Sequence, residues 1–309
     1  MICQTTIARP TAVSGIGLHT GQRINMTLRP ADAGVGIVFH RKTEERTVSI
    51  EATSANVVDT RMATVIGKGD VRVSTVEHLL AALAAYGVDN LHIDIDGPEV
   101  PIMDGSAAPF ASVLEEAGLS RLAQSRKFLA VRKPVSVIDG EKRVSIIPSR
   151  FFRITFDIAF QHPCIALQQR SVKITTSSFR RDLAPARTFG FLKDVEMLKS
   201  AGLARGGSLE NAIVVDDERI LNPEGLRFQD EFVRHKILDA IGDLSLIGYP
   251  ILGHVRAFKA GHDVNHQLVQ KLLDTPESWQ LLEFSEDDLE AALQMAPQKF
   301  ATDLAFSKA

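Results

Sequence analysis

The stretch from residue 232 to residue 243 carries the residue types best suited to chemistry. Its apolar residues recur close to a helical period, and His235, Asp239 and Asp243 stand four residues apart. Residues four apart share one face of a helix, so the three side chains form a polar stripe. An imidazole and a carboxylate on such a stripe can supply two ligands of a tetrahedral zinc ion. A solvated face with capping or salt-bridging residues explains the same spacing.

Other histidines and acids could complete such a site. Glu77 and His78 stand near the start of a second predicted helix, between Ser74 and Gly87, and His262 begins a third. Adjacent helical side chains approach one point only at a helix end, so Glu77 and His78 could both face a cleft. Ser74 and Glu77 also have the spacing of a capping box, which gives Glu77 a purely structural explanation.

Two imidazoles and one carboxylate leave a fourth position of zinc open, which is typical of catalytic sites. Water in that position becomes acidic, a nearby carboxylate can take its proton, and a second group must protonate the leaving group. Glu77 and His262 suit these two tasks, and Asp243 could orient His262. The HExxH motif of metalloproteases is missing. Because nine histidines allow other combinations, the residue types alone leave the site undecided.

Composition limits the class of protein. The chain has 309 residues, enough for two domains, and a formal charge of -3, which gives no reason to expect nucleic acid as a partner. Its two cysteines, Cys3 and Cys164, suggest no disulfide framework and suit a reducing compartment. The N-terminus lacks a signal-peptide pattern, and the apolar run 79–88 is too short to span a bilayer. We expect a cytoplasmic protein without a transmembrane segment.

The order of patterns predicts an α+β fold with two similarly built halves. Each half begins with alternating strand patterns and ends with helices. Glycine-containing turns at 67–70 and 139–140 predict hairpins, and residues 204–208 read as a flexible connector. The polar run 120–127 lacks periodicity, so the domains are predicted at 1–124 and 125–290, followed by a tail at 291–309. A cleft between domains is a common place for a small-molecule site.

Six literal motifs resemble one enzyme family. They are GIGLHTG (15–21), STVEHLLAAL (74–83), EVPIMDGSA (99–107), ARTFGF (186–191), DEFVRHKILDAIGDL (230–244) and KAGH (259–262). Their order and wording resemble the zinc-dependent UDP-3-O-acyl-N-acetylglucosamine deacetylases, which act early in lipid A biosynthesis in Gram-negative bacteria. The motifs span residues 15–262, so the resemblance covers nearly the whole chain.

The resemblance implies two β-α-α-β layered domains packed face to face, with the site between them. It implies Zn²⁺ on His78, His235 and Asp239. It further implies roles for five catalytic residues: Glu77 as general base, His262 as general acid, Thr188 on the oxyanion, Lys236 beside the metal against substrate, and Asp243 steadying His262.

The resemblance also implies a UDP-sugar substrate with an acyl chain, held in an apolar passage built by an insertion in the second domain. The matching segment runs from about residue 189 to residue 215. The substrate-binding residues expected there and beside it are Leu18, His19, Met62, Phe189, Phe191, Val195, Ala212 and Val214. Phe160 would stack on uracil, and Lys142 and Lys259 would contact phosphate. Ordinary core packing is the alternative for each apolar member, and for Val195 and Val214 it explains the residue equally well. Ala159 departs from the acidic residue usual in the family.

The expected reaction is hydrolysis of the N-acetyl amide of UDP-3-O-[(3R)-3-hydroxyacyl]-N-acetylglucosamine with release of acetate, the committed step of lipid A biosynthesis. Two alternatives stay open: a zinc amidohydrolase for a different acylated amino sugar, and a catalytically silent sugar-nucleotide binding protein. Nothing in the sequence demands an oligomer, so a monomer is expected.

Overall fold

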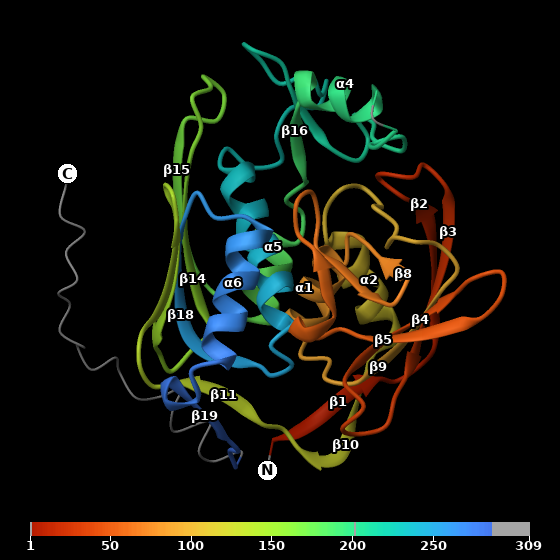
Figure 1. The fold of residues 1–309 in the computed structure, drawn as a ribbon, viewed down its shortest axis with the longest axis vertical. Coiled ribbons are helices and arrows are strands. Elements are labelled where there is room, and N and C mark those ends of the chain that lie inside the picture. Colours follow the sequence, from red (N-terminus) through yellow and green to blue (C-terminus); the bar gives the residue numbers. More distant parts are fainter. Residues whose placement is uncertain (1, 201, 286–309) are drawn as a thin grey trace.

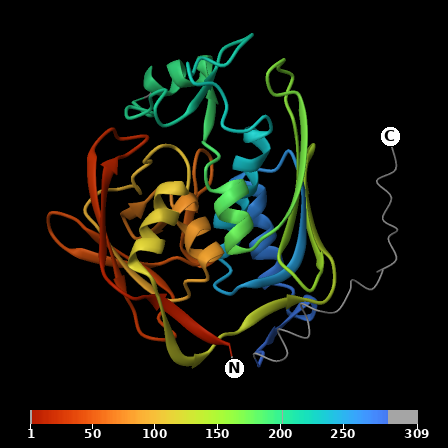
Figure 2. The same cartoon turned by 180° about the vertical axis from the view of Figure 1, so that it is seen from behind.

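The computed structural model describes residues 2–200 and 202–285. Figure 1 shows α1, α5 and α6 in the middle of the molecule, with β14, β15 and β18 on one side and β2, β3 and β4 on the other. The view from behind in Figure 2 shows the same arrangement, with helices enclosed between strands. The described part of the chain is therefore a mixed α+β structure, as predicted.

The first half of the chain forms three sheets and two α-helices. Its elements are β1 (Cys3–Ile7), β2 (Thr11–Ile16), β3 (Arg23–Pro30), β4 (Ile37–Lys42), β5 (Thr47–Glu51), η1 (Ser54–Asn56), β6 (Val57–Asp59), β7 (Val65–Lys68), β8 (Val71–Val73), α1 (Glu77–Tyr86), β9 (Leu91–Ile95), α2 (Ala108–Ala117) and β10 (Leu119–Ser125). The main sheet has the order β2-β3-β9-β4-β5. The smaller sheets are β6-β7-β8 and β1-β10.

The second half contains a seven-stranded sheet and the helices that carry most of the candidate site. Its elements are β11 (Phe128–Val131), β12 (Val135–Asp139), β13 (Lys142–Pro148), β14 (Arg153–Ala159), β15 (Leu167–Lys173), α3 (Thr176–Ser178), η2 (Phe179–Leu183), β16 (Phe189–Phe191), α4 (Leu192–Ser200), β17 (Ile213–Val215), α5 (Glu231–Ser245), β18 (Ile251–Phe258), α6 (His262–Leu273), η3 (Pro276–Ser278) and β19 (Trp279–Leu282). Strand β18 pairs with β11, β13 and β14. A separate parallel pair, β16-β17, lies beside α4.

The central contact of the fold joins α1 to α5. Nearly every residue of both helices is buried, which is typical of helices enclosed in a core. Gly242 of α5 lies directly against α1, because a Cβ at that position would stand 2.1 Å from the carbonyl oxygen of Glu77. The helix α1 ends at Gly87, whose φ of 75° belongs to the left-handed region that favours glycine. The two helices are therefore held in register at the end of α1 where Glu77 and His78 lie.

Several expectations about elements are confirmed and others are wrong. The three site-bearing helices and the hairpins at 67–70 and 139–140 are present. The capping box is absent: α1 begins at Glu77 without a side-chain cap, and Glu77 accepts a hydrogen bond from Thr64 instead. The polar run near residue 120 is a strand, β10, because it pairs with β1 at a largely exposed edge where periodic apolar residues are not needed. The predicted tail 291–309 lies outside the described residues.

Residues 204–208 are not a loose connector. The amide of Gly206 donates to the carbonyl of Leu18, and the amide of Arg205 donates to that of His19. A Cβ at Gly206 would stand 2.1 Å from the carbonyl oxygen of Gly17, so glycine permits this close approach. The glycines that suggested flexibility instead join the first half of the chain to the segment between α4 and β17. Within the described residues, no helix has the length and apolar character needed to cross a membrane.

Candidate metal centre and active site

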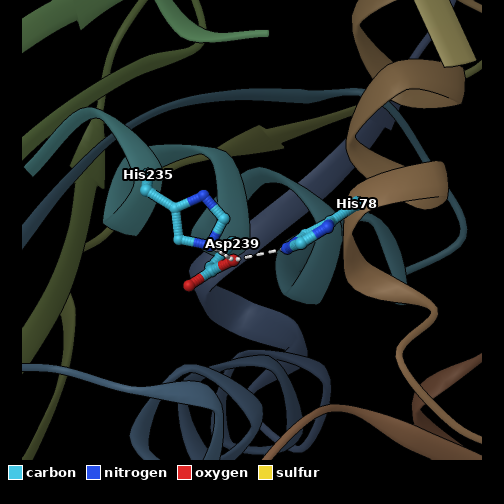
Figure 3. Close-up of side chains that lie close together, drawn as sticks. All are labelled: His78, His235 and Asp239. Carbon is cyan, nitrogen blue, oxygen red and sulfur yellow. Dashed lines mark ion pairs between the residues drawn. The ribbon is translucent and has the colours of Figure 1, made fainter. Parts of the chain in front are cut away.

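Three buried side chains from two helices meet at one point. Asp239 Oδ1 lies 3.5 Å from His78 Nε2 and 3.2 Å from His235 Nε2. The two imidazole rings stand nearly perpendicular, with centroids 4.9 Å apart. Figure 3 shows His78 reaching from α1 toward His235 and Asp239 on α5. Their ligand atoms all lie within 4.8 Å of one another, so one ion could contact all three.

The protonation states of His235 and Asp239 suit a metal ion. Burial lowers the pKa of His235 to about 3, so its imidazole is neutral. Burial alone would raise the pKa of Asp239, but the nearby His235 and Lys236 outweigh it and hold that pKa well below its usual range. Asp239 Oδ1 is buried and makes no hydrogen bond within the described residues. Because a buried charged oxygen needs a partner, this oxygen, which has no hydrogen bond and lies beside two imidazole nitrogens, fits a cation.

Glu77 stands beside the trio at the first position of α1. Its Oε2 accepts a hydrogen bond from the amide of Thr64 at 3.0 Å. Burial raises the pKa of this carboxyl group, while His262 and His78 oppose that shift. A carboxylate with a raised pKa, next to a metal centre, is suited to accept a proton near neutral pH.

His262 forms a close pair with Asp243. Its Nδ1 lies 3.0 Å from Asp243 Oδ2 and 3.1 Å from Oδ1. Burial alone would lower the pKa of His262, but Asp243, aided by Glu77 and Asp239, raises it to about 9. The imidazole is therefore protonated at neutral pH, with its Nε2–H free to donate a proton.

Two residues that the sequence did not single out organise this pair. The hydroxyl of Thr64 donates to Asp243 Oδ1, and its amide donates to Glu77. Asn265 donates from Nδ2 to Asp243 Oδ2 at 2.9 Å. Thr64 thus connects the candidate base, Glu77, to Asp243, the partner of the candidate acid. It lies directly before β7, and no motif in the sequence marked it.

A residue with left-handed backbone conformation precedes each of the helices α1 and α6. Thr75, two residues before Glu77, has φ of 57°, and Lys259, three residues before His262, has φ of 51°. A β-branched residue in the left-handed region is an outlier that the surrounding structure must maintain. At Ser74 the chain bridges to Glu99. Both strained residues lie where the chain turns from a loop or strand into a site-bearing helix.

Lys236 and Thr188 lie next to the trio in different ways. Lys236 Nζ binds Asp239 Oδ2 at 2.8 Å. Burial alone would lower the pKa of Lys236, but Asp239 raises it, so the amine stays charged. Thr188 is fixed by its backbone: its amide donates to Gly105, and its carbonyl accepts from Ile213. It follows Ala186 by two residues, and the carbonyl of Ala186 accepts a hydrogen bond from His235 Nδ1.

An aromatic cluster extends from the trio into the segment 189–215. Phe189 contacts the ring of His235 at 6.4 Å between centroids and that of Phe160 at 5.9 Å. Phe160 also contacts Phe191 at 5.8 Å. Gly190 pairs with Val214 across β16 and β17. The strand pair therefore brings four of the predicted substrate-binding residues together: Phe160, Phe189, Phe191 and Val214.

Fewer contacts are seen for the other residues predicted to bind the acyl chain. A Cβ at Gly190 would stand 3.7 Å from Val195, and one at Gly207 would stand 3.6 Å from Leu18. Ala212 follows Asn211, whose carbonyl approaches Gly105. Met62 is 52% exposed, in the loop where Thr60 donates to Asp263. Val195 therefore lies close to Gly190 and Leu18 close to Gly207, whereas Met62 lies on the surface.

His19 has an unusual environment. Both of its ring nitrogens are buried, and neither has a hydrogen-bond partner within the described residues. The buried carboxylate of Glu99 holds the surrounding turn by accepting from the amides of His19 and Thr20. A buried imidazole without partners is costly, so it favours a ligand that supplies them.

The two predicted phosphate-contacting lysines lie at the same end of the antiparallel strands β13 and β18. Lys142 is the first residue of β13, and Lys259 follows Phe258, the residue of β18 that pairs with Arg143. Lys259 Nζ also forms an ion pair with Glu141 at 2.8 Å. This end of the sheet precedes the start of α6, so the lysines and His262 lie on one edge.

A cavity of about 720 Å³ lies away from all of these residues. Its walls include Leu83 and Tyr86 near the end of α1, Ile241 and Ser245 of α5, and Phe151. None of the predicted site residues lines it. This cavity lacks the cluster of titratable side chains, so we assign the chemistry to the trio.

The site combines the carboxyl group of Glu77, the protonated imidazole of His262 and the buried trio of His78, His235 and Asp239. This set of side chains is typical of a metal-dependent hydrolase. A comparison with family models matches residues 4–274 to LpxC, described as UDP-3-O-acyl N-acetylglycosamine deacetylase. The chain belongs to this family, and the resemblance seen in its motifs is confirmed.

Curated relatives agree over nearly the whole length. The UDP-3-O-acyl-N-acetylglucosamine deacetylase of Syntrophotalea carbinolica is 63% identical over 295 residues, covering 96% of each chain. The protein of the same name from Myxococcus xanthus is 54% identical over 93% of this chain and 91% of its own. That from Acidithiobacillus ferrooxidans is 46% identical over 100% of both.

Proposed function

We propose that this protein hydrolyses the N-acetyl amide of UDP-3-O-acyl-N-acetylglucosamine, releasing acetate, in lipid A biosynthesis. Membership of the family over residues 4–274 supports the reaction. The observation that carries the proposal is the meeting of His78, His235 and Asp239, with a carboxylate oxygen that has no hydrogen bond in the described structure and lies beside two imidazoles. Its surroundings contain the buried carboxyl group of Glu77, whose pKa is raised, and the protonated imidazole of His262.

The metal we propose is Zn²⁺, held by His78, His235 and Asp239. Two neutral nitrogens and one carboxylate oxygen are the ligand set of a catalytic zinc site. When bound, Zn²⁺ supplies a Lewis acid that makes water a strong nucleophile near neutral pH. Lys236, which binds the other oxygen of Asp239, limits the net charge and holds the carboxylate in place.

The protein residues then perform the proton transfers. Glu77 accepts a proton from the attacking water as the carbon–oxygen bond forms. Thr188 donates a hydrogen bond to the carbonyl oxygen as negative charge develops on it. His262 gives its Nε2 proton to the nitrogen as the carbon–nitrogen bond breaks, and Asp243 stabilises the cationic imidazole until then. Acetate leaves, and the amine stays on the sugar.

Substrate recognition is proposed for the residues around this centre. The aromatic cluster of β16 and β17, with Leu18, Val195 and Ala212, would contact the acyl chain, and Met62 would cover it from its exposed loop. Phe160 would stack on uracil, and Lys142 and Lys259 would contact the diphosphate. His19, whose buried nitrogens have no partner in the described structure, would hydrogen-bond substrate.

We further propose that the halves 1–124 and 125–290 are two layered domains facing one another across the site. The main sheets lie on opposite sides of α1 and α5, which supports this division. The passage for the acyl chain would run along the insertion from Phe189 to Val215. Action as a monomer in the cytoplasm stays a prediction from the sequence.

The test combines metal analysis with product release. The purified protein is measured for bound zinc and for acetate released from a series of UDP-3-O-acyl-N-acetylglucosamine substrates with different acyl lengths. We expect about one zinc per chain and acetate release that stops after chelation and returns with added Zn²⁺. Absence of bound zinc together with absence of acetate release would overturn the proposal.

A further inference from the structure

A buried ion pair links the segment before Thr188 to the start of α5. Arg187 is 1% exposed and Glu231 is fully buried. Arg187 Nε donates to Glu231 Oε1 at 3.0 Å, and its terminal nitrogens donate to Glu224 and to the carbonyl of Gly225. Burying an ion pair has a desolvation cost, and such pairs often add little to the free energy of unfolding. A buried ion pair beside the candidate site therefore suggests a role other than stability.

The geometry of one peptide group supplies that explanation. The amide N–H of Arg187 donates to Glu231 Oε1 at 3.0 Å. The carbonyl of the same peptide group, that of Ala186, accepts from His235 Nδ1 at 3.0 Å. Glu231 and His235 stand one turn apart on α5. Because a peptide group is planar, fixing its N–H also fixes the direction of its C=O.

The orientation of this peptide group determines the state of His235. A carbonyl oxygen can only accept, so Nδ1 of His235 must carry the ring proton. Nε2 then presents its lone pair to His78 and Asp239, the form that a metal ion requires. We propose that Glu231 is a positioning residue for metal binding: it orients the Ala186–Arg187 peptide group, which in turn fixes the tautomer and direction of His235.

In this arrangement the side chain of Arg187 acts on Glu231. Its guanidinium pairs with the buried carboxylate and holds it in place. A second backbone donor, the amide of Arg227, binds Glu231 Oε2. The inference rests on the proposed function only in taking His78, His235 and Asp239 as metal ligands.

The test separates stability from metal affinity with two variants. Arg187→Met keeps the carboxylate that accepts from the peptide N–H but leaves it without its cation. The double variant Arg187→Met with Glu231→Met removes the acceptor but replaces the ion pair by two apolar side chains, an exchange that is often neutral or stabilising. Glu224→Gln is the matched control, because Glu224 binds the same guanidinium from an exposed position.

Zn²⁺ affinity is measured on metal-free proteins by competition with a chromophoric chelator, and stability by thermal unfolding of the same samples. We expect the single variant to be the less stable of the two and to keep near-parent affinity. We expect the double variant to lose about 10–100-fold in affinity, the usual effect of removing a group that orients a ligand. The control should match the parent in both.

Equal zinc affinity of parent and double variant would overturn the inference. So would a result in which the less stable of the two variants is also the one with the weaker zinc affinity. If the double variant does not fold, nitrogen NMR of the metal-free parent decides, since a proton on Nε2 of His235 contradicts the inference. A parent that neither binds zinc nor releases acetate would refute the proposed function. If the parent binds zinc and releases acetate, and the double variant has the same zinc affinity, only the role of Glu231 is refuted.

Discussion

The helices α1 and α5 contribute to the same centre in opposite ways. In α1 the reactive side chains Glu77 and His78 occupy the first turn, and the rest of the helix is leucine, alanine and tyrosine. In α5 the reactive side chains His235, Asp239 and Asp243 are spread through the interior of the helix. A helix start has free backbone donors and can face a cleft, whereas a helix interior has none to spare.

The difference determines where each set of side chains finds its partners. Those of α5 depend on distant segments: His235 on Ala186, and Asp243 on Thr64 and Asn265. Asp239 finds Lys236 on its own helix. In α1, Glu77 needs only the amide of Thr64. We therefore expect changes at His235 and Asp239 of α5, as at His78 of α1, to damage metal binding. A change at Glu77 should damage proton transfer alone.

The largest effect is expected for Asp239→Asn. The change removes the charge shared by the two imidazoles, so the protein should lose its metal and its acetate release should fall to that of chelated parent. Metal content and turnover are measured together. A variant that retains stoichiometric zinc and parent turnover would contradict the assignment of Asp239 to the metal.

Glu77→Gln tests the other side of the comparison. Glutamine keeps an oxygen for the amide of Thr64 but cannot take a proton, so we expect zinc content and thermal stability near the parent. Turnover should fall by about 10²–10⁴-fold, the usual contribution of a general base. Near-parent turnover would show that another group accepts the proton. Loss of zinc would show that Glu77 also supports the metal site.

Asp243→Asn should change the pH profile. Asp243 is the main cause that raises the pKa of His262 to about 9, and the general acid acts only when protonated. Without that charge the pKa falls, so the alkaline limb of kcat/KM should move to lower pH, by about 1–3 units for a close opposite charge. The profile is measured on zinc-loaded protein, and Asn265→Ala, which leaves the charge of Asp243, serves as control. An unmoved alkaline limb would exclude His262 as the acid.

The sequence predicted the elements of α1 and α5 well because both carry local signals. A helical period and a terminating glycine at residue 87 are enough to locate α1. The strand β10 was missed because its exposed face removes the apolar alternation on which strand prediction depends. The prediction for residues 204–208 was wrong for a related reason. Glycines in a sequence suggest a flexible backbone, but here Gly206 permits a close approach to the backbone of Gly17.

The candidate site was predicted in the same uneven way. The stripe of His235 and Asp239 follows from spacing on one helix, but its meeting with His78 is a contact between distant segments that no local pattern encodes. The family motifs supplied that pairing. Thr64 and Glu231 stayed unnoticed because their roles depend on the partner each one meets. Glu231 even stands inside a quoted motif, and only its hydrogen bond to the amide of Arg187 shows its use.

The smallest expected effect concerns the contact between the two helices, Gly242→Ala. Helix propensity alone would favour alanine by about 1 kcal/mol. The new methyl group, however, would stand 2.1 Å from the carbonyl oxygen and 2.8 Å from the Cα of Glu77, which are backbone atoms that cannot move aside by rotation. The helices must separate, so we expect a net loss of about 1–3 kcal/mol in the free energy of unfolding.

Separation of the helices would also draw His78 away from His235 and Asp239, so Zn²⁺ affinity should fall together with stability. Chemical unfolding and chelator competition are measured on the same preparation. Gly190→Ala is the matched control, because its methyl group would meet only Val195 at 3.7 Å and its φ is ordinary. If Gly242→Ala lowered stability but left zinc affinity at the parent value, the metal centre would tolerate movement between α1 and α5.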